Sequence, residues 1–468
     1  MSRSVVGREE SVVVANGSGV ATGSGVATGS GVARSGVARE VGVLVIGAGP
    51  TGIGAAVRLQ QERADWLLVE AETGPGGMAS SVTDEHGFTW DLGGHVLHSH
   101  FEDFDKAIAE SGVQLLAPVR NGWVWMHHEL MPTPVQHQVE VLPTDLEPDG
   151  PADNLADFYR NHLGADLYGR FFKPFTEKMW ATPLELIDHE WTSLRNGSAA
   201  RNVPSIRVRE STESPAPVTF PYPAGGTGRL WDAIAAGLDQ DRIRYGSTVV
   251  DIDLGTRVAR LDTGEQIGFT DCVSSMSLTT LLGAVDEPDL ARLAPEFRSN
   301  QSLVIGLGFD GPTPAALLGK SWLYCPDRDV AWHRATMLSH YDQQNAGPGR
   351  WSVLCEVGRS DFRSIEQEDA VASCIASMVE LGADPATLVS TWIRVVPRGY
   401  PVPTLGRDDL LHRIDDRLLS AGIRSRGRFG GWRYESCNQD YSFQQGIEAV
   451  DGILYGAAEN VYWHPERF

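Results

Sequence analysis

The sequence predicts an α/β fold in which a Rossmann-like domain is interrupted by an inserted, mainly helical domain and by an inserted antiparallel β-sheet domain. From Val41, VGVLVIGAGPTGIGAAVRLQQ has the pattern of a short apolar strand, a glycine turn and a helix, and WLLVEAE supplies a second strand. NLADFYRNHLGADLYGRFFKPFTEKMW spaces its apolar residues as a helix does. SLVIGLGF, RATMLSHY, RWSVLCEVG and STWIRVVP are typical of short strands that would form an antiparallel sheet.

These segments divide the chain into a tail and three predicted domains. The tail repeats GSGVAT from Gly17 and again from Gly23. A Gly- and Ser-rich repeat cannot bury enough apolar surface to offset the entropy of ordering, so we expect disorder there. The predicted ranges are 1–40 for the tail, 41–95, 216–295 and 401–468 for the discontinuous Rossmann-like domain, 96–215 for the helical domain and 296–400 for the antiparallel-sheet domain.

Composition excludes some classes of protein. The formal net charge of -22 over 468 residues argues against nucleic-acid binding, because a phosphate backbone would be repelled. It leaves open an anionic small molecule held by a few arginines. The five scattered cysteines form no C-x-x-C pair, which favours a reducing compartment. With no apolar run of membrane length and no signal segment, we expect a cytoplasmic protein without a membrane partner.

Histidines also raise the question of a metal site. They lack a ligand pattern such as H-E-x-x-H, so no metal site is predicted. The histidines concerned are His98, His100, His127, His128 and His137.

The turn after the first strand carries a dinucleotide-binding pattern. Gly47, Gly49 and Gly52 form G-A-G-P-T-G directly after the strand. The first glycine permits the tight turn, the second lets the backbone approach a pyrophosphate, and the third lets helix and strand pack closely. Glu70 ends the next strand, where a carboxylate can accept hydrogen bonds from ribose hydroxyls. The motif in this setting predicts a bound dinucleotide.

Two further glycine pairs distinguish FAD from NAD. They lie in ETGPGGMASS and in DLGGHVLHSH. Their arrangement resembles the FAD-dependent amine oxidases and their relatives, in which these loops follow the pyrophosphate and the isoalloxazine ring. The resemblance implies FAD, with contacts from Gly77, Met78, Gly93, Gly94 and Val249, the last beside adenine.

Within that superfamily, several segments together resemble the UDP-galactopyranose mutase family, most of all its eukaryotic-type branch. They are DLGGHVLHSHFEDFD, EKMWATP, FPYPAGGTGRLW, SWLYCPDRDVAWHRAT, RGYPVPTLGRDD and RGRFGGWRYESCNQDYSFQQGIEAVD. The similarity runs from about Val41 to about Asp451, and the last segment is the most specific.

This resemblance implies a redox-neutral isomerase. It would interconvert the pyranose and furanose forms of a nucleoside-diphosphate hexose through a covalent adduct between N5 of reduced FAD and the sugar. NADPH or NADH is the implied external reductant. The eukaryotic-type enzymes carry a longer C-terminal extension, so a homodimer or monomer is expected here in place of their tetramer.

The resemblance also assigns roles to single residues. Arg195 and Arg334 would bind the diphosphate, since arginine gives bidentate hydrogen bonds to phosphate. His95 would lie beside the flavin and Asn438 would reach the sugar, so the predicted catalytic set is His95, Arg195, Arg334 and Asn438. The remaining residues comprise phosphate donors, a pocket wall and flavin neighbours: Tyr324, Tyr400, Tyr434, Trp180, Arg428 and Gln439.

The sequence departs from the family at the expected base pocket. The family has an aromatic-Pro-aromatic-Gln run where this chain has Thr133, Pro134, Val135 and Gln136. Stacking on an aromatic ring contributes roughly 1–3 kcal/mol per base. Three further residues differ from the family: Thr176 replaces the asparagine before the Lys-x-Trp run, His98 replaces a phenylalanine near the flavin, and Pro217 replaces an asparagine near the sugar. We therefore expect a base or sugar other than those of UDP-galactose, such as a GDP- or dTDP-sugar of specialised metabolism.

Two other functions remain open at this point. An oxidase or desaturase on the same scaffold would consume oxygen and need no prior flavin reduction. A non-catalytic protein that binds flavin and a nucleotide sugar would bind ligand without turnover.

Overall fold

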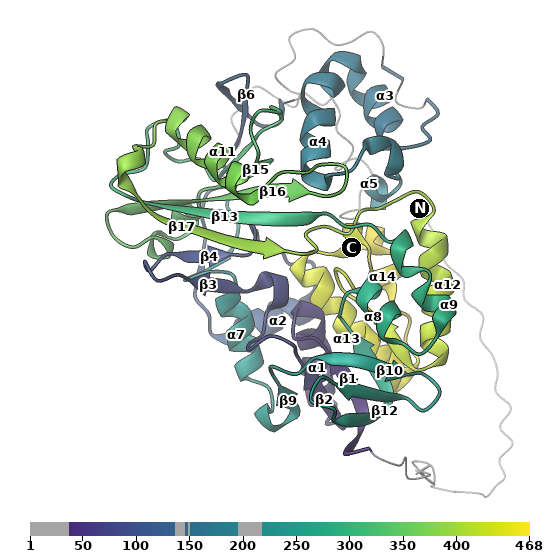
Figure 1. Ribbon diagram of the computed structural model, residues 1–468. Helices are drawn as coiled ribbons and strands as arrows, with labels where there is room; N and C mark the ends of the chain where they lie inside the picture. The colour runs from purple at the N-terminus through teal and green to yellow at the C-terminus, as the bar shows by residue number, and fades with distance from the viewer. Residues whose placement is uncertain (1–36, 136–145, 148–149, 195–217) are drawn as a thin grey trace, which may run out of the picture. The chain divides into compact units, whose positions relative to one another are not determined.

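The computed structural model describes residues 37–135, 146–147, 150–194 and 218–468 (Figure 1). Residues 36–468 form one compact unit. Nearly all of the predicted tail, together with Gln136 and Arg195, lies outside the described residues.

The first sheet is the Rossmann-like one, as the sequence predicted. Its strand order is β10-β11-β12-β1-β2-β9, and β18 also pairs with β12. The central strand β1 lies parallel to both β2 and β12, and β12 lies parallel to β18. The strands are β1 (Arg39–Ile46), β2 (Trp66–Val69), β9 (Ile243–Arg244), β10 (Val249–Asp253), β11 (Val258–Leu261), β12 (Gln266–Ser274) and β18 (Ile423–Ser425). Segments far apart in the sequence thus share one sheet.

Two helices next to this sheet meet at backbone contact. They are α1 (Pro50–Gln61) and α13 (Gln439–Tyr455). A Cβ placed on Gly54 would lie 2.2 Å from the carbonyl oxygen of Phe443, and one on Gly446 would lie 2.0 Å from that of Thr51. Only glycine permits this approach, which brings the start of α13 beside the glycine turn before α1.

The second sheet has the order β17-β13-β16-β15-β14-β6-β7. All its pairs are antiparallel except β14 with β6. Two of its strands, β6 and β7, come from the range expected to be mainly helical, whereas the domain bounds themselves stay a prediction. The strands are β6 (Gly122–Met126), β7 (Glu129–Pro132), β13 (Gln301–Asp310), β14 (Trp322–Tyr324), β15 (Arg334–Thr336), β16 (Arg350–Arg359) and β17 (Leu388–Val396).

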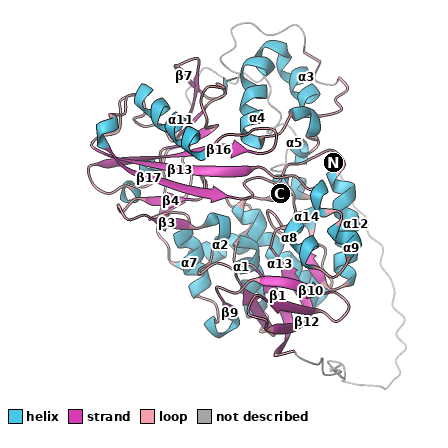
Figure 2. Cartoon of the chain, viewed as in Figure 1, coloured by secondary structure: helices cyan, strands magenta, loops and turns pink. Residues whose placement is uncertain are grey.

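This second sheet is covered on both faces. Helix α11 (Gln367–Glu380) packs Ala370, Cys374 and Met378 against one face (Figure 2). A hairpin of β3 (Ser81–Thr83) and β4 (Thr89–Asp91) covers the other face, where Gly306 and Gly308 of β13 leave room for the rings of Trp90 and Phe88. Apolar side chains therefore pack against both faces of this sheet.

The helical insertion also forms where the sequence predicted helices. Asn154 caps the first of them, because its side chain accepts hydrogen bonds from the amides of Ala156 and Asp157. Its helices are α3 (Leu155–Leu167), a π-helical turn (Tyr168–Phe172), α4 (Lys173–Trp180) and α5 (Trp191–Leu194).

The other elements connect or cover these parts. They are α2 (Glu102–Ser111), α7 (Gly228–Ala236), α8 (Leu278–Ala284), α9 (Pro288–Ala291), α10 (Leu338–Tyr341), α12 (Arg407–Ser420), α14 (Asn460–Trp463), β5 (Leu115–Leu116) and β8 (Tyr222–Pro223). Among the described residues, none of these helices has the length and apolar character to cross a bilayer.

Candidate functional site

The glycine turn after β1 has the geometry of a dinucleotide loop. Gly47 has a φ of 98°, which favours glycine, and a Cβ on Gly52 would lie 1.8 Å from the carbonyl oxygen of Gly47. At Gly49 the situation differs, because a Cβ there would meet nothing within 4 Å. Glu70 braces the loop from the end of β2, since its Oε2 accepts from the Ala48 amide at 2.5 Å. The turn is tight where helix and strand meet and open at Gly49.

The second glycine pair folds back onto the first loop. The amide of Gly76 donates to the carbonyl of Ala48 at 2.8 Å. Gly77 has a φ of 52°, and a Cβ on it would lie 3.3 Å from Cα of Gly49. Met78 follows and packs, partly buried, against the core of the first sheet, which also contains Val249. The predicted cofactor residues of both loops are therefore gathered at one end of the sheet.

This arrangement fits the pyrophosphate of FAD. The first amides of an α-helix have no acceptor within the helix, and Gly49 at the N-cap of α1 supplies no side-chain cap. The open side of Gly49 gives a phosphate access to these amides and to the positive end of the helix dipole. Glu70 follows β2, where its two carboxylate oxygens accept from the amides of Ala48 and Glu72, and its contact with a ribose stays a prediction.

The third glycine pair connects this loop to the second sheet. The amide of Gly94 donates to Oε1 of Glu356 at 3.0 Å. A Cβ on Gly94 would lie 2.4 Å from the hydroxyl of Thr336, so only glycine fits. His95 follows, and its Nδ1 is buried with no hydrogen-bond partner among the described residues. Burial lowers the pKa of His95, which favours a neutral ring with a polar atom left for a ligand.

Three polar residues form a row across the second sheet. Tyr324 of β14 is paired with Arg334 of β15, and Arg334 is paired with Glu356 of β16. Directly paired residues project from the same face of a sheet, so the three side chains are neighbours. Nε of Arg334 donates to Oε1 of Glu356 at 2.7 Å. The terminal nitrogens of Arg334 have no acceptor in the part of the chain that the structure describes, which leaves them available to an anion.

The charges of this row are strongly coupled. Burial opposes the ionisation of Glu356, but Arg334 brings the pKa of Glu356 down to about 2. Burial likewise opposes the charge of Arg334, and Glu356 raises its pKa above the ordinary value. Burial raises the pKa of Tyr324, so its hydroxyl keeps its proton and can donate. The row thus offers two donors, and the carboxylate of Glu356 fixes one of them, Arg334.

Aromatic rings stand next to this row. The rings of Trp180 and Tyr434 are 4.7 Å apart, and those of Tyr400 and Tyr434 are 5.8 Å apart. The hydroxyl of Tyr400 lies 3.5 Å from Oε2 of Glu356, which joins the aromatic wall to the row. The structure therefore brings together the predicted donors Tyr324, Tyr400 and Tyr434 with Trp180 and Arg334.

The segment from Arg426 to Asp451, which resembles the family most specifically, contributes residues to both the site and the scaffold. The guanidinium of Arg428 lies 4.9 Å from the Tyr400 ring centre and donates to Sγ of Cys437 at 3.0 Å. Asn438 occupies the N-cap of α13 with a half-buried side chain that makes no capping bond. Gln439 accepts from Nε1 of Trp231 at 2.7 Å. These residues surround the start of α13. The close packing of α13 on α1 brings this start beside the glycine loops.

Other residues of that stretch are structural. Trp432 is 1% exposed and packs against Phe297 and Phe429. Arg433 lies in a buried ion-pair cluster in which Glu435 also binds Arg407, with an Nη2–Oε1 distance of 2.6 Å. These residues of the segment therefore stabilise the scaffold.

In this structure, Thr133 and Val135 of the expected base pocket contact other parts of the protein, and Thr176 is buried. The hydroxyl of Thr133 donates to the carbonyl of Gly122 at 2.9 Å. Val135 is buried in the core beside α3 and α4, and Thr176 is buried within α4. Base contacts from Thr133 and Thr176 remain a prediction.

Glu356 is the site residue that sequence reasoning missed. It is a single acidic residue in the apolar run RWSVLCEVGR of β16, and its side chain is 5% exposed. A lone carboxylate in a buried strand seldom occurs without a partner, so this run carried a usable signal. Its partners come from β15 and from the third glycine loop, which lie far away in the sequence.

Comparisons with known proteins agree with this geometry. Residues 45–110 match the family of NAD(P)-binding Rossmann-like domains, and residues 136–431 match that of flavin containing amine oxidoreductases. A crystal structure of reduced UDP-galactopyranose mutase matches with a TM-score of 0.85 and 32% identity, over 91% of this chain and 97% of that chain.

More distant solved structures share the fold. Putrescine oxidase bound to putrescine gives a TM-score of 0.65 at 13% identity, over 89% of this chain and 99% of that chain. Cyclohexylamine oxidase from Brevibacterium oxydans IH-35A gives 0.65 at 14% identity, over 88% of this chain and 98% of that chain. At such low identity, the likeness concerns the fold alone.

Proposed function

Because the chain belongs to the UDP-galactopyranose mutase family of flavin-dependent proteins, we propose that it is a nucleotide-sugar mutase that interconverts pyranose and furanose forms of a nucleoside-diphosphate hexose. The observation that carries the proposal is the row of Tyr324, Arg334 and Glu356, which is tied to the third glycine loop through the Gly94 amide. This link puts the Arg334 guanidinium, which would bind phosphate, next to the loop expected to follow the flavin ring.

FAD would be held by the three glycine loops. Gly47, Gly49 and Gly52 with the start of α1 would bind the pyrophosphate, and Glu70 would accept from the ribose. Gly93 and Gly94 would lie along the ring system, where His95 presents its unpartnered nitrogen. Bound and reduced by NADPH or NADH, FAD would supply a nucleophile for the anomeric carbon of the sugar.

The chain's own residues would hold the departing diphosphate. Arg334 would donate from its terminal nitrogens while Glu356 fixes its Nε, so the guanidinium needs little reorganisation. Tyr324, Tyr400 and Tyr434 would donate from their hydroxyls, and Arg195, outside the described residues, would complete the set. Asn438 would orient the sugar from the start of α13.

The base pocket supports a substrate other than UDP-galactose. Thr133 and Val135 stand where the family has stacking rings, and in this structure one hydrogen-bonds to the backbone while the other packs in the core. Trp180 remains as an aromatic wall beside Tyr434. We propose that Gln136, Thr176 and Trp180 line a pocket for a different base or sugar.

A kinetic test uses Arg334 and a matched arginine. Arg350 begins β16, the strand of Glu356, but pairs with the exposed Asp310 at 2.9 Å. Isomerisation of the true substrate by the reduced protein should fall at least 100-fold in Arg334→Ala, and Arg350→Ala should match the wild type. Flavin absorbance checks that FAD stays bound. Full activity in Arg334→Ala would refute the site assignment.

A further inference from the structure

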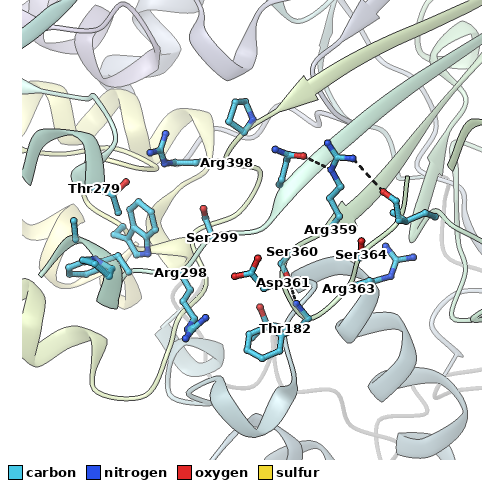
Figure 3. Close-up of a pocket in the computed structure, with 18 of the residues that line it drawn as sticks. Thr182, Thr279, Arg298, Ser299, Arg359, Ser360, Asp361, Arg363, Ser364 and Arg398 are labelled. Carbon is cyan, nitrogen blue, oxygen red and sulfur yellow. Dashed lines mark hydrogen bonds between the residues drawn. The ribbon is translucent and has the colours of Figure 1, made fainter. Parts of the chain in front are cut away.

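A second concave site lies outside the residues assigned above. It is an open pocket of about 720 Å³, lined mainly by residues 294–301, 359–366 and 397–398 (Figure 3). Thr182, Thr279 and Trp432 complete the lining. None of the predicted flavin or nucleotide-sugar residues belongs to it.

Four arginines line this pocket. In Figure 3, Arg298 and Arg398 come from one side and Arg359 and Arg363 from the other. Within the described residues, none of the four forms an ion pair with a carboxylate. Arg298 is exposed and the other three are half-buried, whereas a fully buried arginine such as Arg426 is paired with acidic side chains.

Two of these arginines are anchored by neutral acceptors. Nη2 of Arg363 donates to the carbonyl of Ala331 at 2.7 Å, and Arg359 donates to the side-chain oxygen of Gln301. Neutral acceptors orient a guanidinium but leave its charge uncompensated.

The other two arginines are less constrained. The guanidinium of Arg298 lies 5.4 Å from the ring centre of Phe362, and Arg398 makes no hydrogen bond to any described residue. Burial lowers the pKa of Arg398 and of Arg363, since no carboxylate offsets the lost hydration. An anion entering the pocket would relieve that cost in a protein whose net charge is -22.

The pocket also has acceptors and hydroxyls between the arginines. Figure 3 places Asp361, Ser299 and Ser360 between the two arginine pairs. Asp361 and Glu366 have no ion-pair partner among the residues described, so the four guanidinia leave the lining with a surplus of two positive charges. A carboxylate between the arginines can accept hydrogen bonds from the hydroxyls of a sugar.

We infer that this pocket binds a phosphorylated sugar or nucleotide. The arginines would bind its phosphate, and the Asp361 carboxylate would accept hydrogen bonds from its hydroxyls. The inference does not rest on the proposed mutase activity. One arginine of the pocket, Arg398, comes only two residues before Tyr400 of the proposed nucleotide-sugar site. A test must therefore separate binding at the two places.

Isothermal titration calorimetry of the FAD-loaded full chain distinguishes binding at the arginine pocket from binding at the proposed mutase site. The salt concentration is about 50 mM, so that screening is weak. The probes are pyrophosphate, ATP and glucose 6-phosphate. We expect a binding event that persists in Arg334→Ala and weakens at least ten-fold in Arg298→Ala/Arg398→Ala. Arg292→Ala is the control, because Arg292 is exposed, lies in the same region of the chain and pairs with Asp289.

Asp361→Asn supplies a second readout. It should weaken glucose 6-phosphate binding and leave pyrophosphate binding equal or tighter, since it removes a repulsive charge. The inference is overturned if no probe binds at millimolar concentration, if the double variant binds as the wild type does, or if Arg334→Ala abolishes all binding.

Discussion

Arg334 and Glu356 face each other on neighbouring strands, with Nε of the arginine 2.7 Å from Oε1 of the carboxylate. The same oxygen accepts from the amide of Gly94 at 3.0 Å. One carboxylate oxygen thus fixes both the expected phosphate-binding cation and the loop expected beside the flavin. We therefore propose that Glu356 positions the residues for both ligands.

Glu356→Gln should reduce kcat/KM for isomerisation by about 100-fold while FAD remains bound, because a small displacement of Arg334 misplaces the diphosphate. Steady-state kinetics of the reduced protein measure the change. Glu185→Gln, at an exposed pair with Lys173, is the control and should have no effect. Unchanged kinetics in Glu356→Gln would show that the pair does not position substrate.

The same pair predicts a pH dependence of stability. The pKa of Glu356 is lowered from 4.5 to about 2, so its stabilisation is fully present above about pH 4.5 and is lost as pH falls towards 2. A shift of this size corresponds to about 3 kcal/mol. Urea unfolding of the wild type and Glu356→Gln between pH 7 and 3 should give free energies that converge at low pH. Parallel curves would contradict this assignment.

Two glycines of the first loop should respond differently to substitution. The Cβ of Gly49→Ala would meet no atom within 4 Å, so the free energy of unfolding of the apoprotein should stay within about 1 kcal/mol of the wild type. The affinity for FAD should fall sharply. Gly52→Ala places a Cβ against the Gly47 carbonyl and should lower both stability and FAD affinity.

Urea unfolding of apoprotein and flavin fluorescence titration measure the two effects. Gly283→Ala, which also meets nothing within 4 Å, is the control for both. If Gly49→Ala bound FAD as the wild type does, the cofactor would not approach this loop.

The buried cluster around Glu435 should be important for stability. Its side chain is fully buried between Arg407 and Arg433. Glu435→Gln would leave two buried cations with Asp408 as their remaining carboxylate among the described residues, at a cost of about 3–5 kcal/mol in the free energy of unfolding. Asp289→Asn, at an exposed pair with Arg292, should change it by less than about 0.5 kcal/mol. Similar urea midpoints for both variants would contradict the prediction.

Local patterns made much of this fold predictable. Glycines at fixed offsets after an apolar strand specify a turn geometry, so Gly47, Gly49 and Gly52 could be placed from the sequence. The wide spacing of Tyr324, Arg334 and Tyr400 carried no such local signal, and only a family resemblance predicted that they meet.

What the sequence could not reveal depends on long-range pairing. Strands β6 and β7 join the second sheet through β14, almost 200 residues later in the chain. Trp432 and Arg433 lie in the segment that resembles the family most specifically, yet their partners Phe297 and Glu435 bury them. The arginine pocket combines segments whose cations look like ordinary surface residues in the sequence.

The central claim is tested most directly by one assay on the wild type. Protein reduced with dithionite under argon is incubated with UDP-, dTDP- and GDP-hexopyranoses and furanoses, and anion-exchange chromatography separates the products. The mutase account predicts a same-mass isomer from at least one nucleotide sugar, with no net consumption of reductant. No isomer from any of them, with oxygen uptake by the protein in air, would contradict it.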